Sequence, residues 1–195
     1  NTDNDPGREQ WQIEHLRARQ VEGLIVATAR VEHPLMQQLH REGVVMVMVN
    51  RRPEGVDVPS ITPDDAAGDE LAVRHLAGLG HTRIAHVAGP QSTSTGVSRA
   101  RAFRAAVRDH GLADDPALVT TTDSWSESAG ADGLRRLLDA GTEFTAIFAG
   151  NDLIALGCYD VFRERGLDCP AQLSVVGFND MPFLDKLQPP LTTIA

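Results

Sequence analysis

The sequence has little of what many metal-binding or disulfide-stabilised proteins need. It contains 2 cysteines and only 5% aromatic residues. Cys158 and Cys169 form no CxxC pair and have no cluster of histidines beside them. The sequence therefore predicts neither a zinc site nor a disulfide framework, and free thiols are expected.

Basic residues are also in the minority. With 18 Lys and Arg against 27 Asp and Glu, the formal charge is −9, so this chain by itself should bind DNA poorly. No apolar run is long enough to span a bilayer. The first five residues, NTDND, contain neither the basic n-region nor the apolar h-region of an export signal. We expect no membrane association and no export signal in the chain as it stands.

Motifs of catalysis are missing as well. The glycines at 78–80 lack the third glycine of a dinucleotide fingerprint and follow a predicted helix, and residues 96–100, GVSRA, only approach the GxSxG pattern. No two histidines have the spacing of a helical metal pair, and the paired carboxylates at 64–65 and 114–115 precede a helix or a turn. The sequence predicts a protein that is not an enzyme and that holds no cofactor or metal.

Apolar strands alternate with helical patterns that stop at glycine. Strands are expected at 23–27, 44–49, 83–88, 146–149 and 173–177, and helices at 8–19, 34–42, 66–79, 99–110, 127–140 and 152–165. The predicted helix ends are Gly43, Gly80, Gly111, Gly141 and Gly166, and the predicted N-caps are Asp64, Ser98 and Asn151 or Asp152. Continuous apolar strands of this kind predict an α/β fold, a doubly wound parallel sheet covered on both faces.

Two breaks suggest more than one lobe. Gly89 and Pro90 follow a strand and lead into the small, polar stretch 91–96, which we interpret as a lobe boundary. Residues 188–190, QPP, precede a short extended run at 191–194. The chain opens on a helix with no strand before it, so the fold is expected to be incomplete at both ends.

Polar side chains gather where predicted strands end, which is the usual ligand position in open α/β sheets. These candidate ligand-binding residues are Thr95, Arg99, Trp125, Asn151 and Asn179. Such groups can satisfy a polyhydroxylated ligand, and Trp125 can stack on the apolar face of a sugar ring or a base. Structural alternatives stay open: an ion pair on a helix for Arg99, a core position for Trp125, and caps or turns for the two asparagines.

Four motifs, in order, resemble the LacI/GalR family of bacterial transcriptional regulators. They are LGHTRIA with GP at 79–90, AIFAGND with ALG at 146–157, SVVGFND at 174–180 and PPLTTI at 189–194. The resemblance extends from residue 21 to the end of the chain.

The resemblance implies a type I periplasmic-binding-protein fold, with two Rossmann-like lobes joined by crossovers and an effector bound in the cleft. It places an N-terminal lobe at 1–88 and a C-terminal lobe at 89–191, with the chain returning to the first lobe at 192–195. The implied partners are a small sugar-like effector, a second copy in a homodimer, and DNA through an N-terminal headpiece that is absent here. A cytoplasmic location follows from the same family.

The family's effector-contacting arginine matches Arg99, although Ala102 stands where the family has glycine before Phe103. Thr95, Trp125 and Asn151 match positions that contact effector or pack on it. Asn179 stands where many members have aspartate, and an amide donates as well as accepts hydrogen bonds.

The favoured reading is therefore the effector-sensing part of a regulator. The alternative is an exported sugar-binding protein of a transporter, which shares the fold. An enzyme that modifies nucleosides or sugars is the least favoured, because no catalytic constellation is found.

Overall fold

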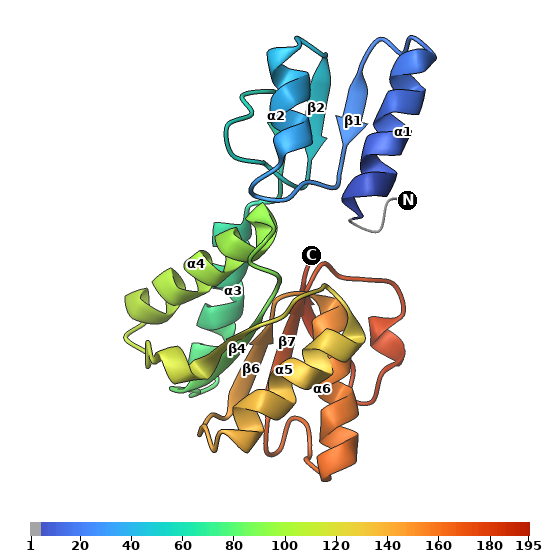
Figure 1. Cartoon of the computed structure of the whole chain (residues 1–195). Helices are drawn as coiled ribbons and strands as arrows, with labels where there is room; N and C mark the ends of the chain where they lie inside the picture. The colour runs from blue at the N-terminus through green and yellow to red at the C-terminus, as the bar shows by residue number, and fades with distance from the viewer. Residues whose placement is uncertain (1–4) are drawn as a thin grey trace. The chain divides into compact units, whose positions relative to one another are not determined.

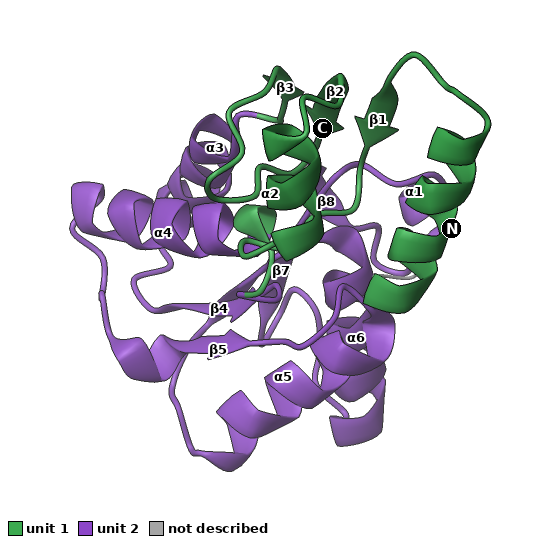
Figure 2. Ribbon diagram, turned by 45° about the horizontal axis from the view of Figure 1, so that its top comes forward, with its two compact units in different colours: residues 1–63, 92–95 green, residues 64–91, 96–195 purple. Residues whose placement is uncertain are grey.

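A computed structural model describes residues 5–195, and the first four residues, part of the segment searched for an export signal, lie outside it. The chain forms two compact units, shown in green and purple in Figure 2. Unit 1 runs to Pro63 and includes residues 92–95, whereas unit 2 comprises residues 64–91 and 96–195.

Unit 1 has a small parallel sheet with the strand order β1-β2-β3. Its elements are α1 (Pro6–Ala18), β1 (Leu24–Val26), α2 (Pro34–Arg41), β2 (Met46–Val49) and β3 (Ser60–Ile61). Ile13 of α1 and Met36 of α2 pack with Leu24 and Met46 into one core cluster. Ile25, which points away from that cluster, is 81% exposed, so the prediction that both faces of each strand are covered is wrong for this part of unit 1.

Unit 2 has a 5-stranded parallel sheet with the order β5-β4-β6-β7-β8. Its strands are β4 (Ile84–Ala88), β5 (Val119–Thr121), β6 (Ala146–Ala149), β7 (Ser174–Phe178) and β8 (Thr192–Ile194). Its helices are α3 (Asp65–Gly78), α4 (Ser94–Asp109, whose first two residues belong to unit 1), α5 (Glu127–Asp139) and α6 (Asp152–Arg165), with short 3-10 helices η1 (Pro116–Leu118) and η2 (Leu184–Lys186).

The helices of unit 2 cover both faces of this sheet (Figure 1). Leu134 of α5 and Ile154 of α6 pack in one core cluster with Ile147 of the sheet. Val73 of α3 and Phe103 of α4 lie in a second cluster. The predicted doubly wound parallel α/β fold is confirmed in unit 2.

Local capping explains where several helices begin and end. The side chain of Asp64 accepts a hydrogen bond from the Ala67 amide at 3.0 Å, and that of Asn151 accepts one from Ile154 at 2.8 Å. The five predicted C-terminal glycines all have positive φ, from 63° at Gly166 to 92° at Gly80. Ser98 is not an N-cap, because α4 already begins at Ser94.

The lobe boundaries predicted from the sequence differ from the two units. The prediction that residues 1–88 form one lobe is wrong, because α3 and β4 belong to unit 2, and the chain first changes unit after Pro63. The predicted return of residues 192–195 to the first lobe is also wrong. β8 instead pairs with β7, with Val176 opposite Thr192, and is the edge strand of unit 2.

Candidate functional site

Arg99 of α4 is the centre of a polar cluster in unit 2, and its side chain is only 4% exposed. Its Nε donates to Asp65 Oδ1 at 3.0 Å, and its Nη1 donates to the carbonyl oxygen of Gly150 at 2.6 Å. Its Nη2 donates to Asn179 Oδ1 at 3.4 Å. One guanidinium therefore joins the start of α3, the end of β6 and the end of β7.

Two aromatic rings accompany this guanidinium. The Arg99 Cζ lies 3.6 Å from the centroid of the Phe178 ring and 5.8 Å from that of the Trp125 ring. Positive charge over an aromatic face is attracted by the ring quadrupole, and a planar guanidinium can also stack. The two rings help to hold Arg99 in one orientation.

Trp125 serves both the core and the polar cluster. It packs against the core cluster that contains Ile154 and lies so close to Gly89 that an added Cβ there would be 2.1 Å from the ring. Only glycine at position 89 leaves room for the indole. The packing agrees with the core alternative, yet the ring is only half-buried and remains beside Arg99.

The structure brings four of the five predicted site residues into unit 2: Arg99, Trp125, Asn151 and Asn179. Asn151 follows Gly150, the residue whose carbonyl binds Arg99, and its own Oδ1 is the N-cap of α6. Thr95 belongs to unit 1, where its hydroxyl donates to the carbonyl oxygen of Asn50 at 2.9 Å.

A second carboxylate, Asp69, lies one helical turn beyond Asp65 and is fully buried. Burial raises its pKa to about 8, and the negative charge of Asp65 acts in the same direction, whereas Arg99 opposes both. Neither carboxylate oxygen of Asp69 accepts a hydrogen bond from another side chain in the described residues, and the backbone amide of Phe103 lowers the pKa without reversing the shift. At neutral pH this side chain is therefore mostly the neutral acid.

His86 of β4 is also fully buried, next to α4. Its ring stacks on Phe103 at 4.5 Å, and its Nδ1 lies 2.8 Å from the carbonyl oxygen of Phe148. A carbonyl only accepts, so Nδ1 carries the hydrogen. Burial lowers the His86 pKa to about 4, and the ring stays neutral at neutral pH. His86 is thus a neutral, hydrogen-bonded histidine of the core.

Sequence reasoning missed Asp65, Asp69 and Phe178. Asp65 was grouped with Asp64 as a helix cap, which is correct only for Asp64. The spacing of Asp65 and Asp69 places both on one face of α3, and a carboxylate pair on a helix face that packs inward was the available signal. Phe178 lies one position beyond the strand predicted at 173–177, and nothing in the sequence pattern singled it out.

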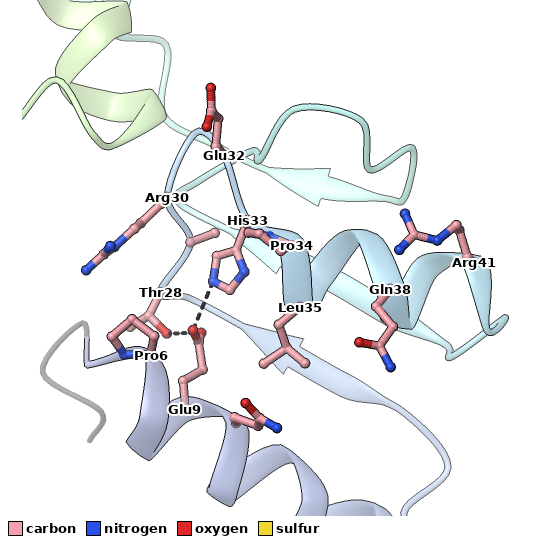
Figure 3. A pocket seen from close by; sticks show the side chains of 12 residues that line it. Pro6, Glu9, Thr28, Arg30, Glu32, His33, Pro34, Leu35, Gln38 and Arg41 are labelled. Atoms are coloured by element: carbon pink, nitrogen blue, oxygen red, sulfur yellow. Dashed lines mark hydrogen bonds and ion pairs between the residues drawn. The ribbon is translucent and has the colours of Figure 1, made fainter.

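A separate cavity of about 430 Å³ lies within unit 1, between α1, the segment after β1, and α2 (Figure 3). The buried carboxylate of Glu9 points toward Thr28, whose hydroxyl donates to it at 3.1 Å, and toward His33 at 2.9 Å. Both oxygens of Glu9 are thereby engaged, and none of the predicted site residues lines this cavity.

Within residues 5–195, no group of His, Cys, Asp and Glu side chains is arranged to hold a metal ion. Over the same residues, no helix combines the length and the apolar character needed to cross a membrane. The candidate site is therefore the cluster around Arg99. It lies where β6 and β7 end, and an open parallel α/β sheet with polar groups at this edge defines a class of protein that binds ligands there.

Comparison with known proteins narrows this class. Residues 73–195 match the model of the family described as "Periplasmic binding protein-like domain". Over the full chain, the sequence is 34% identical to the HTH-type transcriptional regulator DegA of Bacillus subtilis (strain 168) and covers 58% of that protein. It is 31% identical to the ribose operon repressor of Escherichia coli (strain K12), of which it covers 59%.

Solved structures agree. The chain superposes on a transcriptional regulator CelR–cellobiose complex with a TM-score of 0.87 and 30% identity, over 97% of this chain and 58% of the other. The chain thus spans a little under three fifths of the length of these relatives. It belongs to the periplasmic binding protein-like domain family, in the form found in LacI/GalR-type transcriptional regulators.

Proposed function

We propose that this chain is the effector-sensing part of a LacI/GalR-type regulator and that it binds a small sugar-like molecule at the carboxyl edge of the unit 2 sheet. The observation that carries the proposal is the cluster in which Arg99 contacts Asp65, Gly150 and Asn179 beside two aromatic rings. Hydrogen-bonding groups next to aromatic faces match the alternating hydroxyl and CH surfaces of a sugar.

The charges of the cluster favour a neutral ligand. Arg99 is paired with one buried carboxylate, Asp65, and the second carboxyl group, Asp69, is mostly neutral because its pKa is raised to about 8. The guanidinium is thus already balanced and offers no uncompensated positive charge to a phosphate. Asn179, which is exposed, presents an amide that both donates and accepts.

Relatives support the same ligand class. The names of two relatives mention ribose and cellobiose, and both proteins are described as regulators of transcription. They favour a regulator over an exported sugar-binding protein of a transporter. The proposal includes work in the cytoplasm as a homodimer, no enzymatic activity, and DNA binding through a headpiece outside this chain. Effector binding would act by stabilising one conformational state over another.

Arg99, with Trp125 and Asn179 beside it, is proposed to contact the ligand. Thr95 and Asn151 remain predicted contacts, although one hydrogen-bonding atom of each is used within the protein. We do not expect Arg99→Ala to leave the fold intact. It would leave Asp65 as an uncompensated buried charge, a change that typically costs about 3 to 5 kcal/mol.

Asn179→Ala is therefore the better test, because the side chain is exposed. Calorimetry with ribose, glucose and cellobiose should show binding of at least one sugar to the unchanged chain. Asn179→Ala should weaken that binding by about tenfold or more and lower the melting temperature by only a few degrees, because Asn179 has a positive φ and its Oδ1 accepts one long hydrogen bond from Arg99. Arg101→Ala, which alters an exposed arginine two positions beyond Arg99, is the control and should bind normally. Equal affinity in the Asn179 variant, or no binding of any sugar, would contradict the proposal.

Asn179→Asp tests whether the site discriminates between neutral and anionic ligands. The new carboxylate accepts hydrogen bonds but cannot donate them, and it adds a negative charge. We expect the variant to favour glucose over glucose 6-phosphate more strongly than the unchanged chain does. An unchanged ranking in calorimetry would mean that this side chain does not contact the ligand.

A further inference from the structure

The loop that carries Asn179 has an unusual backbone. Asn179, Asp180 and Phe183 have φ values of 119°, 50° and 74°, and none of them is glycine. Such φ values are uncommon for residues other than glycine, so this conformation persists only where the surroundings stabilise it. Something outside the loop must hold it.

Three consecutive backbone amides of the loop are each hydrogen-bonded to a different residue. The amide of Asn179 donates to the carbonyl oxygen of Ile194 at 2.8 Å. The amide of Asp180 donates to Thr193 Oγ1 at 3.4 Å, and that of Met181 donates to Asp152 Oδ2 at 2.9 Å.

Asp152 and Thr193 are joined by a hydrogen bond between their side chains. The Thr193 hydroxyl donates to Asp152 Oδ1 at 2.5 Å, which turns its oxygen lone pairs toward the Asp180 amide. Asp152 is fully buried and is the first residue of α6, where the partial positive charge of a helix N-terminus favours a carboxylate. The carboxylate lies against β7, since a Cβ at Gly177 would be 2.3 Å from Asp152 Oδ1.

These contacts link α6 and β8 to the loop, yet neither Asp152 nor Thr193 is bonded to Arg99. We infer that Asp152, acting through its own carboxylate and through the Thr193 hydroxyl, is a positioning residue that fixes Asn179 in its ligand-binding orientation. The inference rests on the proposed function of Asn179. It assigns to Asp152 a role beyond the helix start that the sequence indicates.

The first experiment does not depend on a ligand. In Thr193→Val the side chain keeps its shape but loses the hydroxyl, so hydrogen exchange of the Asp180 and Met181 amides should accelerate about tenfold or more. Thr193→Ser restores the hydroxyl and should restore protection. Thr192→Val, which changes the exposed neighbour on the same strand, is the matched control and should exchange as the unchanged chain does. Unaltered exchange at both amides in Thr193→Val would overturn the inference.

The second experiment tests coupling to Asn179, with ribose, glucose and cellobiose as probes in calorimetry. Thr193→Val should weaken sugar binding about tenfold, but should have little further effect in the Asn179→Ala background. Equal losses in the two backgrounds would show a general structural role and overturn the inference. A loss with Asn179→Ala but none with Thr193→Val would also overturn it, while leaving the proposed function intact. No loss with Asn179→Ala would instead contradict the proposed function.

Discussion

Asp69 shows how much the state of one side chain depends on its surroundings. In the unfolded chain its carboxyl group titrates near the ordinary value of about 4. In the folded protein burial raises the pKa to about 8, with Asp65 adding to the shift and Arg99 opposing it. The native state therefore holds one more proton than the unfolded state between these two pH values.

This difference gives the stability a predictable pH dependence. Because the native state releases that proton only above pH 8, the contribution of Asp69 to the free energy of unfolding falls as pH rises from about 4 to about 8. Asp69→Asn cannot ionise, so it should remove this decline and be more stable than the unchanged chain at pH 8, by roughly 2 to 5 kcal/mol. Urea unfolding of both chains at pH 5, 6, 7 and 8 measures this difference in the free energy of unfolding.

Asp185→Asn, which changes an exposed carboxylate, is the control and should keep the pH profile of the unchanged chain. The low pKa of His86, about 4, has the opposite effect on the free energy of unfolding. Because His86 stays neutral in the folded protein but takes up a proton in the unfolded chain, it lowers the stability of the protein as pH falls below about 6.5. The Asp69 comparison is therefore clearest above pH 6.5. A profile for Asp69→Asn that parallels the unchanged chain there would contradict the assigned protonation state.

At the scale of elements, α5 and α6 pack unusually closely on one face of the unit 2 sheet. A Cβ added at Gly157 of α6 would lie 2.0 Å from the carbonyl oxygen of Glu127 and 2.5 Å from the Ala131 amide. One at Gly130 of α5 would lie 2.4 Å from the carbonyl oxygen of Ile154. Glycine at these two positions lets the backbones of the helices approach each other.

Two glycine to alanine substitutions test this packing against helix propensity. Gly157→Ala should lower the free energy of unfolding by about 1 to 3 kcal/mol, because the methyl group meets backbone atoms that cannot move independently. Gly78→Ala is the matched control in the last turn of α3, where nothing lies within 4 Å of the added Cβ. It should stabilise the protein by up to about 1 kcal/mol. Destabilisation by both, or by neither, in thermal unfolding would contradict the close-packing argument.

At the scale of the whole molecule, the net charge determines how strongly the chain can bind DNA. With a formal charge of −9, the chain should repel the DNA backbone, so we expect this chain by itself not to carry the DNA-binding function proposed for the full regulator. In a gel-shift assay at 50 mM salt, we expect no sequence-selective complex with operator-like DNA. A tight, sequence-selective complex that survives 200 mM salt would show that these residues read DNA themselves.

The sequence by itself predicted most of the secondary structure of unit 2. The periodicity of apolar residues and the glycines at helix ends are local properties of the sequence. The strand at 146–149 and the helix at 152–165 therefore have the predicted bounds, and the glycines at the helix ends have the expected positive φ. Ordered motifs along the chain also identified the family, because each is a short stretch readable without knowing its neighbours. The short strands β3 and β5 were missed, since a few residues at a sheet edge carry little periodicity.

Tertiary structure decided what depends on contacts between distant segments. The stretch 91–96 after Gly89 and Pro90 was predicted to be a lobe boundary, and residues 92–95 do belong to unit 1, but the first change of unit occurs earlier, after Pro63. Gly89 itself is where the Trp125 ring packs. The extended run after Pro190 became the edge strand β8 because β7 offered it hydrogen-bonding partners. The pairing of Arg99 with Asp65, the neutral state of Asp69 and the link from Asp152 through Thr193 to the Asn179 loop all require burial and proximity, which residue order alone does not specify.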